Sequence, residues 1–159
     1  QMVRVQMPST TPIVTYTMLA ACVLIYLGQM ASNAIYSFDL LAAMGAKINE
    51  LIMQGELWRL VTPMFLHGSL IHLGFNMYAL YNMGRSLENG YGHPRFLLLY
   101  LVAGVAGNVA SFAFSPQPSL GSSTAIFGLL AADAVFSTRT ASCLAGEPLR
   151  CSVRLAPSL

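Results

Sequence analysis

Residues 96–114 read FLLLYLVAGVAGNVASFAF, a run that contains no charged side chain. A helix needs about 20 predominantly apolar residues to cross a lipid bilayer. The run belongs to one of three uncharged intervals that are each long enough for such a helix: Arg4 to Asp39, Arg59 to Arg85 and Arg95 to Asp133. These intervals predict an all-α polytopic membrane protein.

The composition excludes the main alternatives to a membrane protein. Of the 159 residues, 55% are hydrophobic and 9% are charged, and the mean hydropathy is +0.61. Ordinary soluble domains carry about 25% charged residues, and a small soluble domain leaves much of its surface in water. Disorder requires low hydrophobicity. We therefore expect the lipid bilayer as a partner and, with a net charge of only +2, no nucleic acid.

Four membrane helices are expected along the chain, at about residues 12–32, 69–83, 96–114 and 122–137. Residues 1–11 form an N-terminal flank, and residues 139–159 form an atypical polar tail. The long connection at residues 33–68 is predicted to contain short helices, because irregular loops of this length are uncommon.

Strongly polar side chains occur at membrane depth, where they indicate function by default. His72 and Asn76 are four residues apart and therefore share one helix face. Gly121-Ser122-Ser123-Thr124-Ala125 opens the last apolar segment, and the free N–H groups of a helix start are what an oxyanion needs. Serine, histidine and asparagine side chains together would serve acyl transfer.

Structural roles remain open for the same residues. Ser122 or Ser123 is a good helix N-cap, and His72 with Asn76 could form interhelical hydrogen bonds. His67 is interpreted as interfacial. Because the histidines form no HExxH pattern, we expect no metal site.

Small and polar residues recur at helical spacing in the last two segments. They predict stripes along which membrane helices pack closely. The stripes are Gly104, Gly107, Asn108 and Ser111 in one segment, and Gly121, Ala125, Gly128 and Ala132 in the other. Trp58-Arg59, in the long connection, is interpreted as an interfacial anchor with its guanidinium group in water.

Four stretches, in this order and spacing, resemble the rhomboid family of intramembrane serine proteases. They are ELWRLVTPMFLH at residues 56–67, HLGFNM at 72–77, GRSLE at 84–88 and GSSTAIFGL at 121–129. The resemblance covers about residues 12–133. It implies a rhomboid-like helical bundle of which only about four of the six core helices are present, with a partial membrane domain at residues 12–138.

The resemblance also implies roles for individual residues. Ser123 matches the nucleophile of the family, and His72 and Asn76 match the side chains that bind the oxyanion together with the Ser123 N–H. The family uses no cofactor and no metal. Structural motif positions of the family are matched by Trp58, Arg59, Glu88, Gly121 and Gly128.

The implied activity is cleavage of single-pass transmembrane protein substrates by a serine endopeptidase. This sequence departs from the family at Thr124, where glycine usually follows the serine. It also has no histidine after Ser123, whereas the family takes its general base from the sixth core helix. We therefore expect this truncated chain to be inactive. The alternative is a catalytically dead rhomboid-like protein that binds transmembrane segments.

Overall fold

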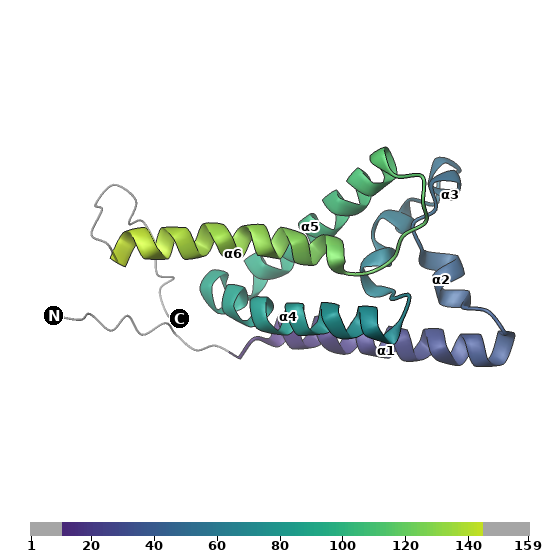
Figure 1. The fold of residues 1–159 in the computed structure, drawn as a ribbon, viewed down its shortest axis with the longest axis horizontal. Helices are drawn as coiled ribbons and strands as arrows, with labels where there is room; N and C mark the ends of the chain where they lie inside the picture. The colour runs from purple at the N-terminus through teal and green to yellow at the C-terminus, as the bar shows by residue number, and fades with distance from the viewer. Residues whose placement is uncertain (1–10, 145–159) are drawn as a thin grey trace.

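The computed structural model describes residues 11–144, which are almost entirely helical (Figure 1). Almost all of the predicted flank at residues 1–11 and most of the predicted tail at residues 139–159 lie outside the described residues. The four long helices are α1 (Ile13–Tyr36), α4 (Leu70–Tyr91), α5 (His93–Phe114) and α6 (Ser123–Leu144). They confirm the expected all-α bundle.

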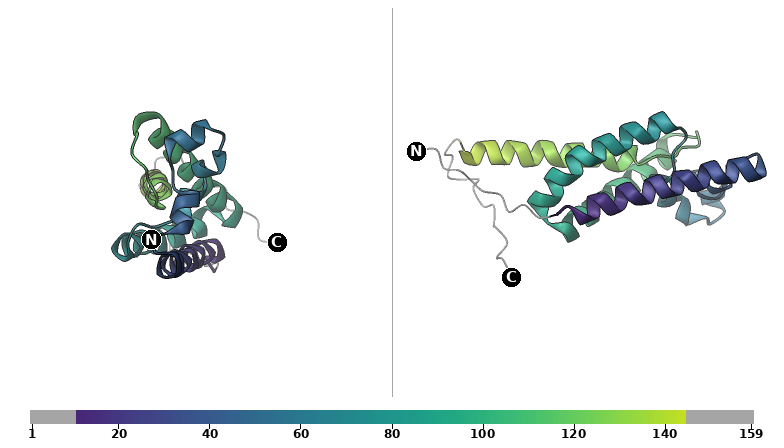
Figure 2. Two further views of the ribbon diagram at one scale, coloured as in Figure 1. Left: turned by 90° about the vertical axis from the view of Figure 1, so that its right-hand side faces the viewer. Right: turned by 90° about the horizontal axis from the view of Figure 1, so that it is seen from below.

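The long helices pack in a fixed arrangement. Helices α1, α4 and α6 run beside one another, and α5 crosses behind them obliquely (Figures 1 and 2). The predicted close packing of the small-residue stripes is confirmed between α5 and α6. A methyl group placed on Gly107 would lie 2.5 Å from the Cβ atom of Thr124, and one on Gly128 would overlap the Cβ atom of Ala103.

Two of the described helices, α1 with 24 residues and α5 with 22, are long and apolar enough to cross a membrane. The apolar part of α6 is shorter, at Ser123–Val135. Helix α4 has 22 residues, which is about 33 Å, but it carries polar side chains. Large apolar side chains point outward from the bundle, as lipid-facing side chains do; examples are Leu24, Leu98, Val102 and Phe127.

Helix α4 continues beyond the predicted end at residue 83, through Arg85 and Glu88 to Tyr91. The polar residues remain helical because Glu88 is completely buried and accepts hydrogen bonds from the first turn of α1. The helix ends at Gly92, whose φ of 79° suits glycine. The connection to α5 is therefore short.

The connection between α1 and α4 contains short helices, as the sequence predicts. They are α2 (Leu40–Gly45), α3 (Asn49–Met53) and the 3₁₀ helices η1 (Leu57–Leu60) and η2 (Thr62–Phe65). Met64 of η2 is fully buried against Gly104 of α5. This contact ties the short helices to the core, which consists of Met64, Leu80, Leu87, Phe96, Tyr100, Ala125 and Leu129.

Candidate active site

The segment before α6 is fixed to the short-helix connection by backbone hydrogen bonds. Lys47 and Ser119 form an isolated antiparallel bridge, in which each backbone N–H donates to the other residue's carbonyl at nitrogen-to-oxygen distances of 3.0 and 3.1 Å. The Gly121 N–H donates to the Pro63 carbonyl at 2.8 Å. We call Gly121–Ser123 the serine turn. Its position is therefore set by the connection as well as by α6.

The two serines of this turn occupy different environments. Ser122 is completely buried, whereas Ser123 is half-buried and is the first residue of α6. The first N–H groups of a helix have no partner within the helix, and the helix dipole adds positive potential there. Of the two residues, Ser123 is therefore the more accessible one at the start of α6.

His72 and Asn76 of α4 both lie beside Gly121. A methyl group placed on Gly121 would lie 2.5 Å from Cε1 of His72 and 3.6 Å from Nδ2 of Asn76. The φ of Gly121 is 129°, which also disfavours any side chain. Asn76 is buried, and its Nδ2 atom makes no hydrogen bond within the described part of the chain. A buried donor therefore stands open beside the serine turn.

His67 is buried, so its interpretation as an interfacial residue is wrong. It is 1% exposed, and its Nε2 atom lies 3.3 Å from the Ser122 hydroxyl. Burial, followed by the charge of nearby His72, lowers the pKa of His67 to about 4, and the Phe65 carbonyl has a smaller raising effect. The imidazole is therefore neutral at pH 7.

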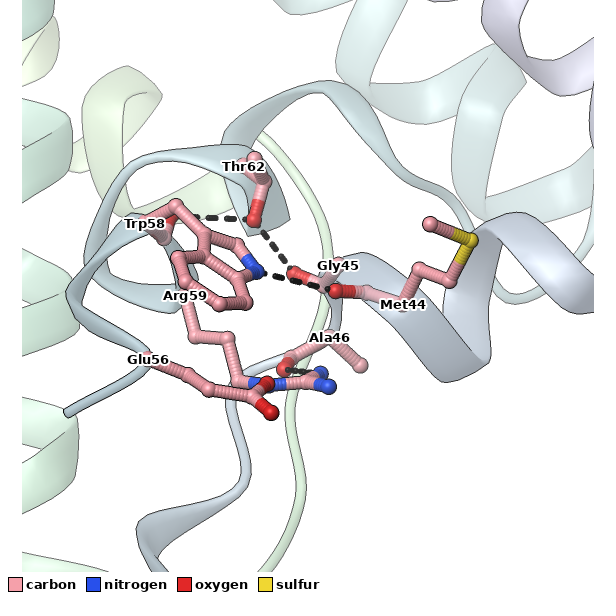
Figure 3. A network of polar contacts seen from close by, with 7 residues as sticks. All are labelled: Met44, Gly45, Ala46, Glu56, Trp58, Arg59 and Thr62. Carbon is pink, nitrogen blue, oxygen red and sulfur yellow. Dashed lines mark hydrogen bonds and ion pairs between the residues drawn. The ribbon is translucent and has the colours of Figure 1, made fainter. Parts of the chain in front are cut away.

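The Trp58-Arg59 pair holds the short helices together (Figure 3). The Trp58 indole N–H donates to the Met44 carbonyl at 3.2 Å. Arg59 donates from Nη1 to the Ala46 carbonyl at 2.8 Å and pairs through Nε with Glu56 at 2.6 Å. The expectation that the guanidinium group lies in water is wrong, since Arg59 is 4% exposed. Its fork of donors satisfies a backbone carbonyl and a carboxylate instead.

Lys47 has a structural role that the sequence analysis missed. It is completely buried, and burial lowers its pKa while nearby Glu50 acts in the opposite direction. Its ammonium group donates to backbone carbonyls in the last turn of α5 and just after it, namely Ser111 at 3.1 Å, Ser115 at 2.7 Å and Gln117 at 2.9 Å. Lys47 is the only lysine in the sequence, which was the available signal. It steadies the segment that leads to the serine turn.

The remaining predicted positions lie away from the serine turn. Glu88 joins α4 to the start of α1, and Gly128 lets α6 approach α5. Thr124 packs against Gly107 of α5, so its side chain faces a helix. Within residues 11–144, no group of three or more metal-binding side chains comes together. Of the predicted site residues, the structure brings three together at one place, namely His72, Asn76 and Gly121, and Ser123 follows two residues after Gly121 at the start of α6.

Known proteins resemble this chain over most of its length. The rhomboid domain family matches residues 54–155. "Rhomboid protease GluP" of Bacillus subtilis (strain 168) is 48% identical over 121 residues, which cover 76% of this chain and 24% of that protein. "Rhomboid-like protease 2" of Toxoplasma gondii is 34% identical over 130 residues, covering 79% of this chain and 46% of that protein.

A plant protein is also similar to part of this chain. "RHOMBOID-like protein 9, chloroplastic" of Arabidopsis thaliana is 44% identical over 88 residues, covering 55% of this chain and 20% of that protein. The chain thus spans less than half the length of each of these three relatives. The matched domain, the similar proteases and the apolar helices agree with the resemblance carried by the four motifs, and the chain is an integral membrane protein of the rhomboid family.

Proposed function

We propose that this chain carries the nucleophile and the oxyanion-binding groups of an intramembrane serine endopeptidase. The observation that carries the proposal is the buried Nδ2 of Asn76, an unpartnered donor beside Gly121. Buried polar atoms usually have a partner, and one without a partner is explained by a bound water, an ion, strain or a catalytic role. An oxyanion would supply the missing acceptor.

The proposed reaction is acyl transfer to Ser123. Its Oγ attacks the carbonyl carbon of the scissile peptide while the Oγ proton passes to a base supplied by another segment or chain, and the π electrons of that carbonyl move onto oxygen. The oxyanion accepts hydrogen bonds from Asn76 Nδ2, from the His72 ring and from the Ser123 N–H. When the tetrahedral intermediate collapses, the C–N bond breaks and the amine leaves with a proton. Water then hydrolyses the acyl-enzyme.

The substrate class follows from the surroundings of the serine turn. The turn is flanked by α4, α5 and α6, whose outer surfaces are apolar. A peptide bond that reaches this turn is therefore presented from the bilayer. We propose single-pass transmembrane proteins as the substrates, and the similarity to rhomboid proteases supports a peptide bond as the group that is cleaved.

The general base is not among the three histidines of the chain. His67 lies against Ser122, and His72 lies against Gly121. His93 pairs with Glu88 near the far end of α4. Because a serine hydroxyl without a base is a weak nucleophile, we expect the 159-residue chain alone to show no proteolysis. It would cleave only when another segment or chain supplies a base.

The positions of the three histidines also favour one alternative, a rhomboid-like protein that binds transmembrane segments without cleaving them. Exposed apolar side chains on α4, namely Ile71, Phe75 and Tyr78, would then form part of the binding surface. The two functions differ in one result. Only a protease domain becomes active when a base is restored.

A chimera tests the proposal. Residues 12–133 of this chain replace the matching part of the Bacillus subtilis relative, and cleavage of a single-pass membrane substrate is measured in lipid vesicles. We expect cleavage, a loss of about 10⁴-fold or more in rate on Ser123→Ala, and activity within about tenfold on Ser122→Ala. The matched pair of variants separates the nucleophile from its neighbour.

Two outcomes would contradict the proposal. A folded chimera that binds the substrate without cleaving it would favour the binding protein. Cleavage that survives Ser123→Ala but is lost on Ser122→Ala would show that the nucleophile is the buried serine.

A further inference from the structure

His67 is fixed in place by a buried side chain of α1. The His67 N–H donates to Oε1 of Gln29 at 3.0 Å, and Nε2 of Gln29 donates to the His67 carbonyl at 3.2 Å. Gln29 is 2% exposed and also donates to Asp39 at 2.6 Å. The backbone of His67 is therefore held on both sides by one amide group.

The ring of His67 contacts both Ser122 and His72. On one side Nε2 lies 3.3 Å from the Ser122 hydroxyl. On the other, the ring meets that of His72 edge to face, with centroids 5.5 Å apart at 66°. His67 thus contacts the residue just before Ser123 and also a proposed oxyanion ligand.

The bond between His67 and Ser122 can run in either direction, because the neutral ring can carry its proton on either nitrogen. The Nδ1 atom makes no hydrogen bond within residues 11–144. With the proton on Nδ1, the Ser122 hydroxyl donates to Nε2, and with the proton on Nε2, the hydroxyl accepts. In both cases the bond joins the His67 ring to the serine turn.

We propose that His67 is a positioning residue that, through Ser122, holds the serine turn against His72 and Asn76. This inference rests on the proposed function. It explains why the buried Ser122 hydroxyl lies within hydrogen-bonding distance of the buried His67 ring. Hydrogen bonds thus connect Gln29 of α1 through His67 to Ser122. Ser122 directly precedes Ser123, the first residue of α6 and the proposed nucleophile.

The test uses a thiol as a reporter at the serine position, because alkylation of a thiol needs no general base. In the full chain, Ser123→Cys is introduced after the native cysteines Cys22, Cys143 and Cys151 have been replaced by alanine. The rate of alkylation by iodoacetamide is measured against pH in detergent micelles. Its midpoint reports the thiol pKa, which nearby donors and a helix N-terminus lower from about 8.5.

We expect Ser122→Ala and His67→Phe each to raise this midpoint by about one pH unit, because the thiolate loses its aligned donors. The double variant should raise it no further than either single variant, as coupled residues do. His67→Gln, which offers an acceptor near the position of Nε2, should restore the value. Thr15→Val, which removes another buried hydroxyl far from the turn, should destabilise the chain and leave the midpoint unchanged.

The outcomes separate this inference from the function on which it rests. If Asn76→Leu raises the midpoint but His67→Phe and Ser122→Ala do not, the oxyanion site stands and the positioning role is refuted. If none of the three raises it, the proposed oxyanion site fails as well. A thiol that stays inert at every pH would place the Ser123 side chain out of reach and overturn both.

Discussion

Glu88 and Asn76 are both buried polar side chains of α4, about 18 Å apart along the helix, and they differ in their hydrogen bonds. Glu88 accepts from the Val14 N–H at 2.8 Å, and from the N–H and hydroxyl of Thr15 at 2.8 and 2.6 Å. His93 contacts it as well. The Nδ2 atom of Asn76, in contrast, has no partner in the described part of the chain.

The difference separates two uses of a buried polar group. The Glu88 carboxylate accepts hydrogen bonds from N–H groups at the start of α1 that have no partner within that helix, and this stabilises the fold. A buried amide donor without a partner lowers stability and leaves a site for an acceptor. Helix α4 thus carries a structural contact with α1 at Glu88 and a proposed ligand site at Asn76, near its other end.

The largest expected effect on stability comes from removing the Glu88 carboxylate. Glu88→Ala should lower the free energy of unfolding by about 4 kcal/mol, because it leaves buried donors of α1 unpaired. The readout is the midpoint of SDS-induced unfolding, followed by fluorescence of Trp58, the only tryptophan. Glu50→Ala is the control, since Glu50 is exposed. Equal losses of unfolding free energy in the two variants would refute the stabilising role of Glu88.

A smaller effect is expected at the contact between α5 and α6. Gly128→Ala should destabilise by about 2 kcal/mol, because the added methyl group overlaps Ala103. A methyl group on Gly74 of α4 meets nothing within 4 Å, so Gly74→Ala should be neutral or stabilising by about 1 kcal/mol. Similar unfolding midpoints for the two variants would contradict the close packing of these helices.

The effect that is smallest near neutral pH is a dependence of stability on pH. The pKa of His67 in the fold is about 4, below its ordinary value of about 6.5, so the unfolded chain binds the proton more tightly. Stability is therefore complete above pH 6.5 and falls as the pH drops towards 4, by up to about 1.4 kcal/mol per pH unit.

His67→Gln removes this titration and provides the comparison. Unfolding curves of the chain and of the variant should diverge below pH 6.5, while the contributions of the carboxylates cancel in the difference. Curves that stay parallel from pH 7 to 5 would mean that the His67 ring is not buried in a neutral form.

The sequence predicts the features that depend on local pattern. Uncharged intervals locate the long helices, and the spacing of Gly107 and Gly128 predicts the close contact between α5 and α6. His72 and Asn76 share a face because helical periodicity requires it. These predictions need no knowledge of what packs against each segment.

Features that depend on distant partners were not predicted. Arg59 was expected in water because its own neighbours in sequence do not reveal the Ala46 carbonyl or the pocket around it. His67 was placed at an interface for the same reason, since Gln29 and Ser122 lie far from it in the sequence. The polar end of α4 remains helical only because α1 supplies donors for Glu88.

The most direct measurement is on Asn76→Leu, made in the protease chimera with both cleavage and stability recorded. Loss of one oxyanion donor should reduce kcat/KM by about 10²–10³-fold. Because the amide donor is unpaired in the fold, the unfolding midpoint should stay the same or rise. Unchanged cleavage, or a loss of cleavage matched by a loss of stability, would contradict the assignment of Asn76 as an open site for the oxyanion.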